Sequence, residues 1–120
     1  MKDKGQAYIN LYLEKLEKEK GYSIHTIDAY KRDLEKFKLF LIDYKGQRFQ
    51  SFKFVDKWAL RNFLGKEGED GMSSKTRRRR LSTIRGFFDY LVMSKKLNDN
   101  PAAYILAPKI EKKIPAIIQQ

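Results

Sequence analysis

The 120-residue sequence contains no cysteine and a single histidine, His25. Without cysteine the chain can form neither a disulfide nor a thiolate site, and one histidine does not make a zinc site by itself. A glycine-rich phosphate loop is also missing, and the acidic residues are scattered among surface lysines. We therefore expect no catalytic residue, no metal and no cofactor in this chain, and we interpret His25 as an ordinary surface residue.

Long apolar runs are absent as well. The longest fall far short of the roughly 20 residues that span a membrane, and the N-terminal MKDKGQAYIN has no apolar signal-peptide core. The sequence therefore predicts a soluble, cytoplasmic protein without a membrane partner. A helix lying on a membrane surface is a weaker alternative, because the apolar sides of the expected helices are needed for a core.

Acidic residues are outnumbered by basic ones. The chain has 26 lysines and arginines against 15 aspartates and glutamates, a net charge of +11. This imbalance points to an acidic partner such as nucleic acid. With 42% hydrophobic and 13% aromatic residues, the chain has enough apolar side chains to fold, and its length fits one domain.

The spacing of apolar residues is helical over most of the chain, which predicts an all-α fold. The main helices are expected over residues 3–20, 23–44, 55–66 and 73–96. Ser23 and Ser73 are expected to cap the second and the last of them. The residues expected on the inner sides are Tyr8, Ile9, Tyr12, Leu13, Leu16, Ile27, Tyr30, Leu34, Phe37, Leu41, Tyr44, Val55, Trp58, Ala59, Leu60, Phe63, Leu64, Leu81, Ile84, Phe87, Phe88, Leu91 and Val92.

The connecting segments carry turn residues. Residues 47–54 and 65–72 are expected to be loops, the first with Phe49, Phe52 and Phe54 packed against the bundle. Asn100 followed by Pro101 predicts a short fifth helix that ends near Leu106. Prolines and charges after it predict an extended linker.

An internal similarity appears at an offset of 50 residues. The matched pairs are Ser23 and Ser73, Thr26 and Thr76, Leu34 and Ile84, Phe37 and Phe87, Phe40 and Tyr90, and Leu41 and Leu91. Two helical hairpins of similar pattern would produce these matches. Any two amphipathic helices would share part of the same spacing.

The helix expected over residues 73–96 carries most of the excess charge, with eight basic residues and one acid, Asp89. The run Arg77–Arg80 lies near its start, where the helix dipole disfavours cations. A bound anion would relieve this conflict, since guanidinium groups and free backbone N–H groups could share phosphate oxygens. A merely solvated basic face is the plain alternative.

The side of this helix opposite its apolar residues is expected to face outward. It carries Lys75, Arg79, Ser82, Thr83, Gly86 and Tyr90. Cations at the start and small residues in the middle suit the DNA major groove, which admits one helix. The helical wheel places Arg77 near the apolar side, as a packing or salt-bridge residue. On the second helix, Thr26 and Tyr30 are equally well explained by capping and burial or by a DNA contact.

Several blocks of the sequence carry a family likeness. They are YSIHTIDAYKRDL at 22–34, SSKT at 73–76, RRLSTIRGFFDYL at 79–91, NPA at 100–102 and PK at 108–109. In their order and spacing the chain resembles the N-terminal core-binding domain of tyrosine recombinases, in particular Xer-like recombinases and phage or transposon integrases. The likeness runs from about Tyr8 to Pro115. The arginine at position 77 departs from it, because relatives often carry an apolar residue there.

The resemblance implies a SAM-like bundle of two crossed helical hairpins that clamps one face of a recombination half-site in double-stranded DNA. It also implies contacts with other recombinase protomers when the protein is full length. In such domains the second and fourth helices meet the DNA. The candidate DNA-binding residues are Thr26, Tyr30, Lys31, Arg32, Lys75, Thr76, Arg78, Arg79, Ser82 and Thr83.

The family's chemistry uses a tyrosine nucleophile in a separate C-terminal domain, so we expect this chain to be inert alone. Residues 1–106 are expected to form the DNA-binding domain, and residues 107–120 to begin the linker to the absent catalytic domain. Two other functions remain open from the residues: a free-standing helical DNA-binding regulator and a helical protein-interaction domain.

Overall fold

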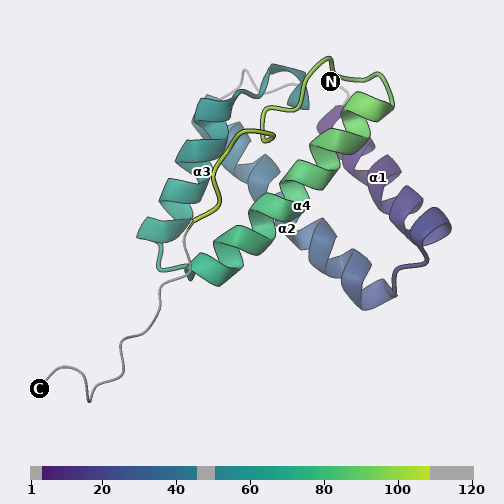
Figure 1. The fold of residues 1–120 in the computed structure, drawn as a ribbon, viewed down its shortest axis with the longest axis horizontal. Helices are drawn as coiled ribbons and strands as arrows, with labels where there is room; N and C mark the ends of the chain where they lie inside the picture. The colour runs from purple at the N-terminus through teal and green to yellow at the C-terminus, as the bar shows by residue number, and fades with distance from the viewer. Residues whose placement is uncertain (1–3, 46–50, 109–120) are drawn as a thin grey trace, which may run out of the picture.

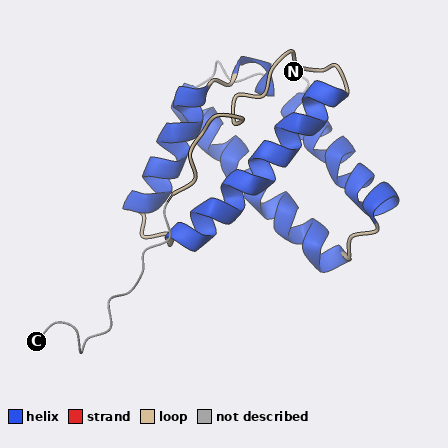
Figure 2. Ribbon diagram, in the orientation of Figure 1, coloured by secondary structure: helices blue, strands red, loops and turns tan. Residues whose placement is uncertain are grey.

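The computed structural model of the protein describes residues 4–45 and 51–108. These residues form four α-helices: α1 (Lys4–Lys20), α2 (Ile24–Lys45), α3 (Lys57–Glu69) and α4 (Ser74–Met93). A short 3-10 helix, η2 (Phe52–Phe54), precedes α3. Helices and loops account for the described part of the chain, and no strand occurs in it (Figure 2). The predicted all-α class is confirmed.

The helices form two crossed hairpins, α1 with α2 and α3 with α4. In Figure 1, α4 lies across the front of α2, with α3 on one side and α1 on the other. Helix α4 packs against all three of the others. It is therefore covered on more than one side, unlike a helix at the edge of a bundle.

Serine caps begin both central helices, as predicted. The Oγ atom of Ser23 accepts a hydrogen bond from the backbone N–H of Thr26 at 3.3 Å. Ser73 does the same for Thr76 at 3.1 Å. Each cap satisfies a backbone donor that the first turn of a helix leaves without a partner.

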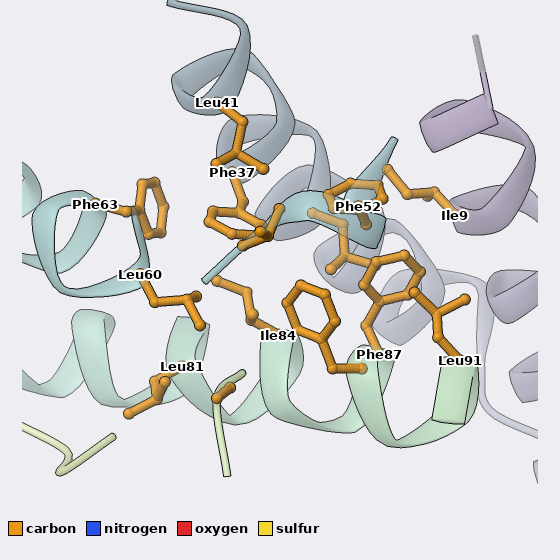
Figure 3. Packing of buried hydrophobic residues seen from close by; sticks show 14 of the residues in the cluster. Ile9, Phe37, Leu41, Phe52, Leu60, Phe63, Leu81, Ile84, Phe87 and Leu91 are labelled. Carbon is orange, nitrogen blue, oxygen red and sulfur yellow. The ribbon is translucent and has the colours of Figure 1, made fainter. Parts of the chain in front are cut away.

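Aromatic rings fill the centre of the bundle (Figure 3). Phe37 of α2 is fully buried and lies edge-on to Phe63 of α3, with ring centroids 5.1 Å apart, and to Phe88 of α4, at 6.2 Å. Phe52 of η2 meets Phe87 at 4.9 Å. Most of the predicted inner residues are buried here: Ile9, Tyr12, Leu13, Leu16, Leu34, Phe37, Leu41, Val55, Ala59, Leu60, Phe63, Leu64, Leu81, Ile84, Phe87, Phe88 and Leu91.

The 50-residue similarity has a structural counterpart. Leu34 and Ile84, and likewise Phe37 and Phe87, are fully buried at matched positions of α2 and α4. The hydroxyl of Thr83 donates a hydrogen bond to Asp33, the residue at the same offset. Matched positions of the two helices thus touch where α4 crosses α2.

Two predicted connections are wrong. Helix α3 begins after the cap Asp56 and continues through Gly65 and Gly68 to Glu69, where a loop was expected. A Cβ atom on Gly68 would lie 3.2 Å from Nη1 of Arg77, so glycine makes room for that guanidinium inside a continuous helix. Residues 101–104 form turns instead of a helix.

Asn100 explains those turns. Its side-chain oxygen accepts from the N–H of Ala102 at 2.8 Å, and its amide donates to Asp89 at 2.7 Å and to the carbonyl of Arg85 at 3.2 Å. The side chain expected to cap a helix therefore fastens the segment to α4.

Three aromatic residues expected inside are exposed. Trp58 is 56% exposed, with Lys57 and Arg61 over its ring at 5.3 and 5.0 Å. Tyr44 accepts a hydrogen bond from Asn62 near the surface, and Phe54 projects from η2. Of the other phenylalanines expected to pack against the bundle from the loop 47–54, Phe52 is buried. Phe49 lies outside the described residues, as does the stretch 109–120.

Tyr12 gives the fold a sensitivity to alkaline pH. Burial, with smaller contributions from Tyr30, Tyr22 and Asp89, raises the pKa of Tyr12 from 10.0 to about 12. Between these values the folded state keeps a proton that the unfolded chain loses, so the free energy of unfolding falls as the pH rises. We expect a loss of about 2 to 3 kcal/mol over this range. Denaturation of the Tyr12→Phe variant should show a flatter pH profile, and parallel profiles would contradict the assignment.

Candidate nucleic-acid interface

The arginines of α4 divide into inward and outward groups. Arg80 points inward and is buried. It donates from Nη1 to Glu67 of α3 and lies with Nε 3.4 Å from Asp33 of α2. Arg80 therefore ties three helices together through two buried carboxylates.

Arg77 also turns toward α3. Its guanidinium lies beside Gly68, and its Nε is buried with no hydrogen-bond partner within the described residues. This agrees with the helical wheel, which placed Arg77 near the apolar side.

Arg78 and Arg85 hold the segment that follows α4. Arg85 donates to the backbone carbonyls of Ala102, at 3.0 Å, and Ile105, at 2.6 Å. Arg78 donates to the carbonyl of Pro108 at 2.8 Å. The segment consequently runs back along α4 toward the start of the helix (Figure 1).

Within the run Arg77–Arg80, Arg79 is exposed, and its guanidinium is held in one orientation. Its side chain is 55% exposed, and Nη2 donates to Oδ1 of Asp33 at 2.7 Å. Asp33 is 2% exposed. A charge-assisted bond to a buried carboxylate orients the guanidinium without removing it from solvent.

The expected outward side of α4 is only partly outward. Thr83 is 3% exposed, and its hydroxyl lies 3.2 Å from both Asp33 and the carbonyl of Arg79. Gly86 faces α1, because a Cβ atom there would lie 2.9 Å from the Tyr12 hydroxyl. The prediction that Thr83 and Gly86 face outward is wrong, since α2 and α1 cover these positions. Lys75, Arg79 and Ser82 are exposed.

A groove of about 250 Å³ lies between α2 and α4, and we call it the α2–α4 groove. Candidates from both helices meet in it, which their separation in the sequence did not show. Tyr30 on its wall stacks on Tyr22, with centroids 5.9 Å apart. Its lining residues are Thr26, Ala29, Tyr30, Asp33, Arg79, Ser82 and Thr83.

The remaining candidates lie outside the groove on the same two helices. Lys31 and Arg32 of α2 and Lys75 of α4 are exposed. Thr76 is half-buried, and its hydroxyl accepts from Ser73 at 3.1 Å. Together with Arg79, these cations give both helices positive charge at the surface.

Sequence reasoning missed Asp33, Glu67 and Arg80 as a cluster. Asp33 directly precedes Leu34, a residue expected in the core. An acid at the border of the apolar side of a helix is the sequence signal that could have predicted a buried ion pair here. Glu67 lay in a segment predicted to be a loop. In the described residues, no group of three or more histidine, cysteine or acidic side chains could hold a metal ion. No described helix is long and apolar enough to cross a membrane.

Fold and surface define an all-α bundle with a cationic two-helix face. The model of the family "Phage integrase, N-terminal SAM-like domain" matches residues 9–95, and the chain belongs to this family. As a member of it, the chain is a SAM-like bundle.

Named relatives agree with this assignment. The tyrosine recombinase XerD of Staphylococcus haemolyticus is 34% identical over 113 residues, 94% of this chain and 37% of the relative. The tyrosine recombinase XerC of Xylella fastidiosa is 40% identical over 101 residues, 83% of this chain and 33% of the relative. The chain thus spans about a third of the length of these relatives. No significant match was found among solved structures.

Proposed function

We propose that the chain is the DNA-binding domain of a site-specific tyrosine recombinase or integrase. It would clamp one face of a recombination half-site in double-stranded DNA during strand exchange or integration. The observation that carries this proposal is the α2–α4 groove, where Thr26 and Tyr30 of one helix meet Arg79 and Ser82 of the other. Family membership and the net charge of +11 support it.

The candidate residues have different roles under this proposal. Lys31, Arg32 and Lys75 would contact phosphates at the edges of the interface, because flexible exposed cations suit the backbone of DNA. Thr76 and Arg78 would lie at its margin. Thr83 would support the groove from beneath, because its hydroxyl is already bonded to Asp33.

The full-length protein would carry out tyrosine-mediated strand exchange together with other protomers. Residues 1–106 would serve as its DNA-binding domain and residues 107–120 as the start of the linker to a catalytic domain. The relatives named tyrosine recombinases are about three times as long as the region that they share with this chain, which supports such a division. The chain alone would bind DNA without cleaving it.

Titration with duplex DNA at several salt concentrations tests the proposal. The logarithm of the affinity should fall by about 0.9 per logarithmic unit of salt for each phosphate neutralised. Removing the charge of Lys75 or of Arg79 should make this slope shallower by about 0.9 in each case, the contribution of one phosphate. Fluorescence anisotropy of a labelled duplex measures both quantities.

Lys57 provides the matched control. It borders a separate cavity together with Lys95 and Lys96, away from the α2–α4 groove. Lys57→Ala removes the same charge from the protein and should leave the slope unchanged. Absence of binding, or binding indifferent to salt, would refute the proposed function.

A further inference from the structure

We propose that the α2–α4 groove holds one phosphate of the DNA backbone and that Asp33 is the positioning residue that aims Arg79 at it. This inference rests on the proposed function and deepens it. Asp33 is buried and negatively charged, so it cannot attract DNA itself. The inference gives it a specific role in binding through Arg79.

The contacts of Asp33 fix the direction of Arg79. One carboxylate oxygen accepts from Arg79 at 2.7 Å and from Arg80 at 3.4 Å, and the other accepts from Thr83 at 3.2 Å. A carboxylate held by three donors and 2% exposed has little freedom to move. The guanidinium bonded to it is therefore preorganised, which lowers the entropy lost when a ligand binds.

Arg79 retains donors for a ligand. A guanidinium carries five N–H groups, and the bond to Asp33 uses one of them. The side chain is 55% exposed. The rest of the planar group can therefore bond a phosphate in the paired geometry that arginine favours.

The shape of the site favours the DNA backbone over a base. The site is concave, so it accepts a projecting group such as a phosphodiester, whereas base edges lie recessed in the grooves of DNA and need a protruding side chain. Ala29 leaves space on the α2 side. The hydroxyl-bearing residues Thr26 and Ser82 line opposite walls and can add hydrogen bonds to phosphate oxygens.

The negative charge of Asp33 does not oppose this role. Asp33 lies against two arginines, Arg79 and Arg80, and the second carboxylate, Glu67, bonds Arg80 on the α3 side. The two carboxylates are balanced by Arg80, which is buried, and by Arg79, whose guanidinium is the exposed end of the cluster. A phosphate in the groove would meet this cation first.

A double-mutant cycle tests the inference, with a short fluorescein-labelled DNA duplex as the probe. Arg79→Ala should weaken binding by about tenfold or more, the usual cost of a lost charge-assisted hydrogen bond. Asp33→Asn should weaken binding by about three- to tenfold, because Arg79 loses its preorganisation. In the Arg79→Ala background, Asp33→Asn should cause no further loss.

Lys75 supplies the control cycle. It lies on the same face of α4, and it is not among the three hydrogen-bond partners of Asp33 within the described residues. The effects of Asp33→Asn and Lys75→Ala should therefore multiply. Circular dichroism shows whether each variant keeps its helices.

Thr83→Val covers the case in which Asp33→Asn does not fold. It removes one hydrogen bond from Asp33 and keeps the charge, and its smaller loss of affinity should likewise vanish in the Arg79→Ala background. Effects that multiply with Arg79→Ala, or tighter binding by Asp33→Asn, would overturn the positioning role. Failure of the wild-type chain to bind duplex DNA would instead overturn the proposed function.

Discussion

Replacing Arg80 by alanine is expected to lower the free energy of unfolding by about 3 to 5 kcal/mol, because it leaves a buried carboxylate without its partner. Arg80 bonds Glu67, whose Oε1 already lacks a hydrogen-bond partner within the described residues. The substitution would strand this acid between α3 and α4. Chemical denaturation followed by circular dichroism measures the loss.

Lys66 and Arg79 provide controls for this variant. The exposed pair of Lys66 and Asp70, 3.7 Å apart, should contribute no more than about 1 kcal/mol, so Lys66→Ala should unfold almost as the wild type does. Arg79→Ala should reduce DNA affinity while keeping the fold, since its partner Asp33 still bonds Arg80. If Arg80→Ala unfolds like Lys66→Ala, the buried cluster does not stabilise the bundle.

Phe37→Ala is expected to lower the free energy of unfolding by about 3 to 5 kcal/mol as well, through the loss of buried surface and the cavity left behind. The ring of Phe37 contacts Phe52, Phe63 and Phe88, which belong to three other elements.

Leu39→Ala is the matched control on the same helix. Leu39 is 65% exposed, so its truncation should change the free energy of unfolding by less than about 0.5 kcal/mol. A loss at Phe37 as small as that at Leu39 would show that the aromatic centre is loosely packed. The denaturation midpoints of the two variants decide between these outcomes, provided that the free energy of unfolding depends equally steeply on denaturant concentration in both.

Apolar periodicity was sufficient to predict the helices that form the two hairpins. Leu34, Phe37 and Leu41 lie on one side of α2 at helical spacing, and all three are buried. Periodicity fails where a contact between a cation and an aromatic ring decides the position of the side chain. Trp58 has the spacing of an inner residue of α3, yet it lies at the surface under the cations of Lys57 and Arg61.

The candidate site was harder to predict than the fold, because a helical wheel describes one helix and not its neighbours. The wheel placed Thr83 and Gly86 outside, and the crossing helices cover both. It placed Arg77 near the apolar side, but it did not show that Arg80 is buried. In the structure Arg80 bonds Asp33 in the interior, and Arg78 bonds the segment that follows α4. Asp33, which also bonds Arg79, lies 46 residues before it, so a local sequence pattern could not predict the pair.

Arg78 and Arg85 grip main-chain oxygens, and this has a consequence for the path of the polypeptide beyond α4. The two guanidinium groups bond backbone carbonyls, which every residue has, and the buried side chains of Ala102 and Ile105 add contacts with the core. Through the bond from Arg78 to the carbonyl of Pro108, the end of the described segment is connected to the helix that bears Lys75 and Arg79.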